Sequence, residues 1–284
     1  MGERATEAIH VSQPQFVIEA RRGLFNIDLA GLWQFRELLY FMVWRDIKVR
    51  YKQTIIGAGW AVFQPLITML MFTAIFGWAV KIPSDGVPYP VFSFSALLIW
   101  TCFAQSVTRS GASLVGEGHL IKKIYFPRLV VPISAIASPV LDLCFSVPVL
   151  AGLLLYYGIT PGWHIVFLPL VVLATILTAM ALGLWLSALN AQYRDIGYVL
   201  PFMMQLGMYA SPVVYPISLI PDQWKYVYNL NPMVGIIQGF RWAVFGGMPP
   251  SPDLLVLNGV IVLVVLFTGL VYFKRIEPIM PDII

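Results

Sequence analysis

The stretch 194–246 begins with RDIGYVLPFMMQLGMYASPVVYP and ends with YNLNPMVGIIQGFRWAVFG. A charged pair opens an apolar segment that ends in Ser-Pro, and a proline-interrupted segment rich in aromatic residues follows. Residues 233–246 have the length of a re-entrant or interfacial segment, because a helix that crosses a bilayer needs about 20 residues. Backbone at that depth must be buried in protein or border a cavity. The pattern is typical of a transport protein whose outer mouth is partly closed by its own chain.

The composition places most of the chain in a membrane. Of the 284 residues, 59% are hydrophobic and only 11% are charged, with a mean hydropathy of +0.79. A soluble domain could not hide that much apolar surface, so we expect an all-α polytopic membrane protein. The net charge of +4 indicates no nucleic-acid partner, because the basic residues lie in loops beside the spans. Cys102 and Cys144 lie in apolar runs, where we expect buried thiols rather than a disulfide or metal site.

Six apolar segments are each long enough to cross a bilayer. They are 55–80, 89–107, 129–157, 165–189, 196–215 and 254–273. The third contains Pro132, Pro139 and Pro148, so we expect a bent or broken helix there.

The basic residues orient these spans. Most of them lie on the side of the two termini, and only Lys81, Lys225 and Arg241 lie on the other. The positive-inside rule then predicts that both termini face the cytoplasm. This arrangement divides the chain into a cytoplasmic N-terminal segment (1–52), a six-span domain (53–273) and a cytoplasmic tail (274–284). Residues 1–28 lack the apolar run of a signal peptide.

The segment 29–52 predicts an interfacial amphipathic helix. One face carries the apolar residues Leu32, Phe35, Leu39, Met42 and Val43, and the other carries Gln34, Glu37, Arg45, Lys48 and Lys52. The pattern fits a membrane-surface anchor and equally fits an additional docking surface for a cytoplasmic partner.

Polar and aromatic residues share helix faces in three spans. The candidates for a pore or sugar-binding lining are Trp60, Gln64, Thr68, Phe72, Gln105, Tyr198, Phe202, Gln205 and Tyr209. A glutamine amide that faces lipid would lose its hydrogen bonds, so these faces are expected to meet protein or a pore. Aromatic rings can stack on sugar rings while neighbouring amides bind their hydroxyl groups. Helix–helix packing, with glutamine hydrogen bonds between spans, is the alternative for any single residue.

Asp142 is the acidic residue deep in a span, and we expect it to be paired or protonated in a structural role. The loop 111–128 reads GASLVGEGHLIKKIYFPR and predicts a short helix at 120–126 that Pro127 ends. Its lysines meet water or an acidic partner, or only fix orientation, and His119 is expected at the surface. Arg194 and Asp195 are expected to form a local ion pair at a helix start.

Motifs for catalysis are missing from the sequence. No GxxxxGK[ST] run, nucleophile elbow, cluster of metal-binding residues or pair of intramembrane carboxylates occurs. We therefore expect neither an enzyme nor a bound cofactor or metal.

Three segments carry a resemblance to a known family. They are RDIKVRYKQTIIGAGWAVFQPL (45–66), KKIYFPRLVVPIS (122–134), and RDIGYVLPFMMQLGMYASPVVYP with NPMVGIIQGFRW within 194–242. The chain resembles the transmembrane permease of ABC transporters that export O-antigen, capsule or teichoic acid, with the O-antigen branch closest. The family often has Ser or Leu at the positions of Thr54 and Ile56, which is a mild departure.

The resemblance implies a homodimer, joined through the first and fifth spans, that works in the bacterial inner membrane. Each copy would bind one of two cytoplasmic ATPase subunits, which would carry ATP and Mg. The substrate would be a polysaccharide linked to undecaprenyl diphosphate. Contacts with the ATPase would come from the pre-membrane helix and from Glu117, His119, Leu120, Lys122, Lys123 and Tyr125.

Two further sets of residues gain a role from this resemblance. Lys48, Arg50 and Lys52 would attract the lipid diphosphate at the cytoplasmic rim, although fixing the topology explains their charges equally well. The hairpin 216–250 would narrow the periplasmic exit through Trp224, Tyr228, Asn231, Pro232, Arg241 and Trp242. Three alternatives stay open: a related permease for teichoic acid, capsule, a drug or a small lipid; an ion-driven transporter that depends on Asp142; and a membrane glycosyltransferase.

Overall fold

The structure is a computed structural model that describes residues 33–52 and 59–284, and every regular element in these two ranges is a helix. The helices are α2 (Arg36–Lys52), α3 (Gly59–Phe72), η1 (Thr73–Ala79), α4 (Tyr89–Gly116), α5 (Gly118–Lys123), α6 (Val130–Tyr156), η2 (Trp163–Phe167), α7 (Leu168–Gln192), α8 (Asp195–Tyr209), η3 (Ile217–Leu219), α9 (Asp222–Tyr228), α10 (Pro232–Phe245), α11 (Pro252–Ile276), η4 (Glu277–Ile279) and α12 (Met280–Ile283). The prediction of an all-α protein is confirmed for these ranges.

Five helical stretches in the described ranges are long and apolar enough to cross a membrane. They are Gly59–Ala79, Tyr89–Gly116, Val130–Tyr156, Trp163–Gln192 and Pro252–Ile279. They correspond to the first four predicted spans and the last one, although residues 55–58 of the first lie outside the described part. The chain is therefore an integral membrane protein.

The predicted span 196–215 is shorter than expected. Helix α8 ends at Tyr209, because Ser211 precedes Pro212 and a residue before proline disfavours the helical conformation. Its 15 residues extend about 22 Å, whereas the hydrocarbon core is about 30 Å thick. The fifth predicted span is thus not a full-length helix in the structure.

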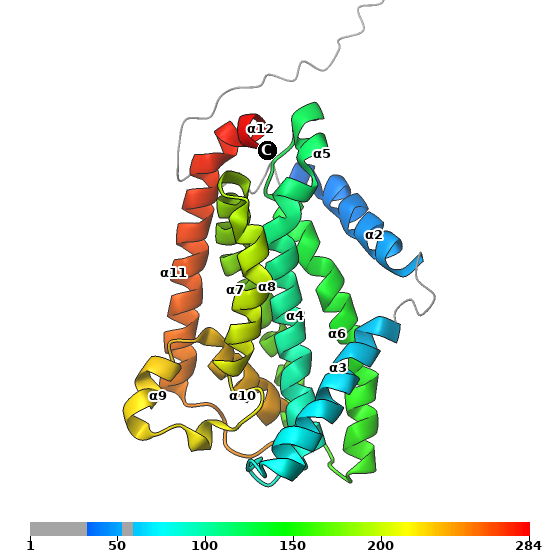
Figure 1. Ribbon diagram of the computed structural model, residues 1–284, viewed down its shortest axis with the longest axis vertical. Coiled ribbons are helices and arrows are strands. Elements are labelled where there is room, and N and C mark those ends of the chain that lie inside the picture. The colour runs from blue at the N-terminus through cyan, green and yellow to red at the C-terminus, as the bar shows by residue number, and fades with distance from the viewer. Residues whose placement is uncertain (1–32, 53–58) are drawn as a thin grey trace, which may run out of the picture.

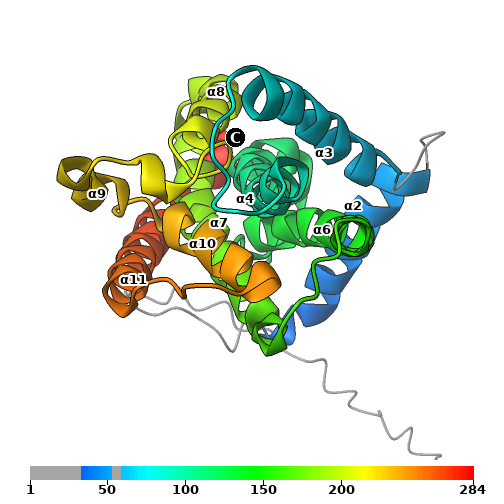
Figure 2. The same ribbon diagram turned by 90° about the horizontal axis from the view of Figure 1, so that it is seen from below.

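Helix α4 is the centre of the molecule, as Figure 2 shows in a view along the bundle. It packs against α3, α6, α7, α8 and α10. Val91, Phe94, Ile99 and Val107 of α4 have no exposed surface. Its contact with α7 is close because position 183 is glycine: a Cβ atom there would lie 2.5 Å from Ser110 Oγ. Small residues permit this kind of approach between membrane helices.

The helix ends gather at two opposite ends of the molecule (Figure 1). At one end α5 and α12 lie close together, Arg128 N donates to Glu277 Oε1 at 3.2 Å, and Arg194 Nη2 donates to the carbonyl of Ile284 at 2.9 Å. At the other end lie α9 and α10. Helix α8 runs from the first end toward the second despite its length. The predicted ion pair of Arg194 with Asp195 is wrong, because Arg194 turns to the C-terminal segment instead.

Helix α6 remains one continuous helix through Pro139 and Pro148, so of the expected bent or broken helix the break is not found. The expectation of two buried thiols is half right. Both cysteines are free, but only Cys102 is buried, whereas Cys144 faces outward from α6.

Helix α2 differs from the predicted amphipathic helix in its faces. Met42 is buried in a cluster formed by the ends of α4, α6, α7 and α11, and Phe35 and Leu39 pack against it. The aromatic residues Trp33, Tyr40, Phe41 and Trp44 remain exposed on the surface of the chain. The apolar stripe therefore packs on protein, while aromatic rings lie exposed beside the polar residues of the other face. Leu32 lies outside the described residues.

Candidate functional site

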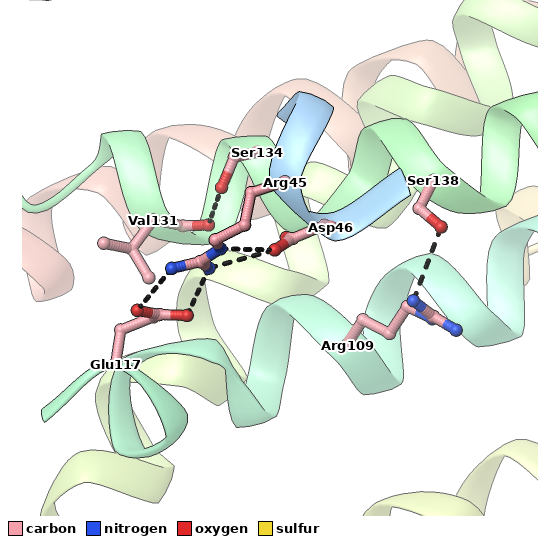
Figure 3. A network of polar contacts seen from close by, with 7 residues as sticks. All are labelled: Arg45, Asp46, Arg109, Glu117, Val131, Ser134 and Ser138. Carbon is pink, nitrogen blue, oxygen red and sulfur yellow. Dashed lines mark hydrogen bonds and ion pairs between the residues drawn. The ribbon is translucent and has the colours of Figure 1, made fainter. Parts of the chain in front are cut away.

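An ionic network joins α2 to the end of α4 (Figure 3). Arg45 Nη1 donates to Glu117 Oε2 at 3.1 Å, and Arg45 Nη2 donates to Glu117 Oε1. Arg45 Nε and Nη2 also donate to Asp46 Oδ1, at 3.1 and 2.9 Å. The hydrogen bond with Glu117 raises the pKa of Arg45 above its usual value, so this guanidinium stays charged. A fork of this kind fixes orientation as well as distance.

A second network joins α2 to α6, deeper in the bundle. Arg50 Nη2 lies 2.5 Å from Asp142 Oδ2, and Arg50 also donates to Ser138 Oγ and to Gln105 Oε1, both at 3.2 Å. The hydroxyl of Tyr51 donates to Asp142 Oδ1, and burial raises the pKa of that hydroxyl, which keeps it a neutral donor. The prediction that Asp142 is paired is confirmed.

Two predicted site residues, Arg50 and Gln105, belong to this network. Arg50 turns inward to a carboxylate, unlike Lys48 and Lys52, which are exposed on α2. Gln105 binds the same arginine and lines a small pocket with Trp60 and Gln64. The sequence analysis named Arg50, Gln105 and Asp142 separately but did not predict their pairing, and it did not single out Ser138. The signal was present on α6 as a polar residue at every fourth position: Ser134, Ser138, Asp142 and Ser146.

The predicted lining residues fall into two groups. Trp60, Gln64, Tyr198, Phe202, Gln205 and Tyr209 are exposed in the chain, and Thr68 is half-buried. Phe72 is buried in the core and contacts Phe76 edge to face, so it does not reach a free surface. Helices α3 and α8, which carry the exposed residues, flank α4 on the same side (Figure 2).

The loop between α4 and α6 contains the predicted short helix as α5. Its apolar residues Ile121 and Phe126 anchor it in the cluster around Met42. His119, Lys122, Lys123 and Tyr125 are exposed, as predicted for His119, and Leu120 is half-buried. Glu117 is held by Arg45. The loop therefore presents a basic, aromatic surface at one end of the bundle.

The hairpin 216–250 is anchored to the end of α8. The Asn231 side chain caps α10 by accepting from Met233 N at 3.0 Å, and it donates to Ser211 Oγ and to the carbonyl of Ala210. Pro232 occupies the first turn of α10, where its missing N–H costs nothing. Helix α10 itself is largely buried, with Val234, Ile237 and Phe240 fully enclosed.

The other predicted gate residues have different surroundings. Arg241 donates to the carbonyls of Phe92 and Val213 and lies 3.5 Å from the centre of the Phe92 ring. Trp242 packs against His164 and Phe167. The Tyr228 hydroxyl lies 3.4 Å from that of Tyr215, whereas Trp224 is exposed on α9. Most of these residues hold the hairpin in place.

Comparison with known proteins defines the class. Residues 37–245 match the family described as ABC-2 type transporter, so the chain belongs to this family of membrane permeases. The chain is similar to the O-antigen export system permease protein RfbA of Myxococcus xanthus, with 30% identity over 87% of this chain and 95% of that protein. A permease of the same name from Klebsiella pneumoniae is 29% identical over 85% of this chain and 92% of its own length. The polysialic acid transport protein KpsM of Escherichia coli is 27% identical over 83% of this chain and 92% of its own length.

Proposed function

We propose that the chain is the membrane subunit of an ATP-driven exporter that moves lipid-linked polysaccharide, of the O-antigen type, across the bacterial inner membrane. The observation that carries this proposal is the similarity, over nearly the full length of both chains, to permeases named for O-antigen export. The sequence has no phosphate-binding loop, so ATP hydrolysis would come from a partner subunit in the cytoplasm. The chain itself is not an enzyme in this proposal.

The exposed faces of α3 and α8 support a pathway formed by two copies. Gln64 and Gln205 are exposed on helices of a membrane protein, where an unpaired amide facing hydrocarbon is costly. A second copy, facing the first across these helices, would enclose the amides with the rings of Trp60, Tyr198 and Phe202. Such a lining offers stacking surfaces to sugar rings without a closed binding cavity.

The two ends of the molecule would then have separate roles. The exposed basic and aromatic residues around α5 would contact the ATPase, and both termini would face the cytoplasm. Lys48 and Lys52 would attract the undecaprenyl diphosphate, while Arg50 is left out of this role because it pairs with Asp142. The hairpin with α9 and α10 would enter the outer part of the membrane and narrow the exit.

The test is co-purification with the ATPase subunit, followed by assay of lipid-linked polysaccharide on cells that lack either chain. A complex of two permeases and two ATPases, with both chains required for display, supports the proposal. Purification of the chain alone, with solute movement under an ion gradient, would overturn it.

A capsular polysaccharide is the second candidate, because the polysialic acid transport protein is also similar over most of its length. Loss of capsule, with O-antigen intact, in cells without this chain would select it. Accumulation of undecaprenyl-linked sugars inside the same cells would select the O-antigen type.

A further inference from the structure

A polar cavity of about 210 Å³ lies between α2, α4 and α6, beside the network in Figure 3. Its polar lining consists of Arg45, Asp46, Arg109, Ser113, Glu117 and Ser134. A space of this size exceeds by far what one water molecule needs, and its walls carry charge. Neither the resemblance nor the comparisons give this cavity a role.

The charges of the cavity are divided between two sides. On the side of α5, the carboxylates of Asp46 and Glu117 share one guanidinium, that of Arg45. On the other side, Arg109 and Arg50 both donate to Ser138 Oγ, at 3.4 and 3.2 Å, and the nearby carboxylate of Asp142 pairs with Arg50. Figure 3 places Arg45 with the two acids and Arg109 with Ser138 at opposite sides of the group. One side thus has a carboxylate in excess and the other a guanidinium in excess.

Hydrogen-bonding capacity follows the same division. Within the described ranges, Arg109 makes one hydrogen bond and no ion pair, so most of its five N–H donors remain available. The hydroxyls of Ser113 and Ser134 donate to the carbonyls of Ser110 and Val131 on their own helices. Both serines line the cavity, as does Asp46, and because their hydroxyl protons are already donated, the two serine oxygens are available there only as acceptors.

We propose that this cavity binds the headgroup of a zwitterionic phospholipid with a primary amine, phosphatidylethanolamine. Its phosphate would bind Arg109, because a guanidinium fork matches phosphate oxygens. Its ammonium group has three N–H donors, which match the acceptors from Asp46, Ser113 and Ser134. A bound headgroup would neutralise both sides at once and would hold α2 against α4 and α6.

The experiment uses the full-length protein in detergent, with native mass spectrometry to count bound lipid. The probes are phosphatidylethanolamine, phosphatidylcholine, phosphatidylglycerol and free phosphoethanolamine. Phosphatidylcholine keeps both charges but has no N–H donor, and phosphatidylglycerol keeps the phosphate but has hydroxyl groups in place of the ammonium. Because charge-assisted hydrogen bonds are lost, we expect each of these two lipids to bind about tenfold more weakly than phosphatidylethanolamine.

Variants separate the two halves of the site. Arg109→Gln should weaken phosphatidylethanolamine and phosphatidylglycerol alike. The double variant S113A/S134A removes no charge and should abolish only the preference for phosphatidylethanolamine over phosphatidylcholine. Arg36→Gln, at an exposed arginine of α2 that does not line the cavity, is the matched control and should bind as the natural chain does.

Three results would overturn the proposal: equal binding of phosphatidylethanolamine and phosphatidylcholine, unchanged binding by Arg109→Gln, or no lipid bound at all. Free phosphoethanolamine that binds as tightly as the lipid would overturn the assignment to a membrane lipid. Gel-filtration profiles of the variants show whether each is folded, and S113A/S134A keeps the test valid should Arg109→Gln fail to fold.

Discussion

Asp142, the carboxylate on which the ion-driven alternative depends, forms an ion pair with Arg50. Asp142 accepts from Tyr51 and Arg50, so its charge is compensated within the described part of the chain. Removing one member of a buried pair leaves the other charge unpaired, which typically costs about 3–5 kcal/mol, whereas removing both costs less. An ion-driven transporter would instead require Asp142 to bind and release the coupled proton or metal ion during transport.

We therefore expect Asp142→Asn to lower the thermal unfolding midpoint of the protein in detergent. The double variant R50Q/D142N should recover part of the loss. Equal midpoints for the natural chain and Asp142→Asn would show that the pair contributes little. An alanine at Ser138, the shared acceptor of two arginines, is the milder comparison.

The Asn231 side chain joins the start of α10 to the end of α8, and its substitution tests how much this contact stabilises the hairpin. Asn231→Ala removes the cap of α10 and both hydrogen bonds to the end of α8, so a stability loss of about 1–2 kcal/mol is expected. Asn231→Asp keeps the acceptor for Met233 N and should lose less. Limited proteolysis of 216–231 measures the effect. Cleavage at the natural rate in the alanine variant would argue that the hairpin is held elsewhere.

Sequence patterns predicted elements better than they predicted faces. The apolar runs located five spans because hydropathy depends on composition alone. They overestimated 196–215, since apolar residues continue past the point where Pro212 ends the helix. They also left open what the apolar stripe of α2 packs on, because helical phase cannot tell a stripe that packs on protein from one that meets lipid. The pairing of Arg50 with Asp142 depends on how α2 lies on α6, which no local pattern contains.

The exposed stripe of helix α8 is predicted to contribute to polysaccharide export. Tyr198, Phe202, Gln205 and Tyr209 form one exposed stripe, and the apolar Val199, Met203 and Leu206 form the neighbouring one. The double variant F202A/Y209A should lower polysaccharide export several-fold without lowering membrane abundance, because stacking surfaces are lost. Met203→Ala, equally exposed on the same helix, is the control and should export normally. Unchanged export by F202A/Y209A would remove both rings from the lining.

In the proposed dimer, the exposed faces of α3 and α8 would form the interface between the two copies. A Cys144→Ser background removes the one exposed thiol in the described ranges. In that background Gln205→Cys should form a disulfide-linked dimer in membranes, whereas Leu263→Cys on the exposed face of α11 should not. Cross-linking by the α11 variant alone would place the dimer interface on the opposite side of α4.

The length of α8 has a consequence for the lipid around it. A helix of about 22 Å beside neighbours that span the full hydrocarbon core creates hydrophobic mismatch. Lipids that reach α8 at the edge of the proposed dimer interface would thin or tilt to follow it, and the bilayer would be weakest beside the proposed path of a hydrophilic cargo. Thinner bilayers should relieve this strain, so the complex reconstituted with short acyl chains should be more stable than in thick ones. A thermal midpoint that rises steadily with bilayer thickness would contradict this view.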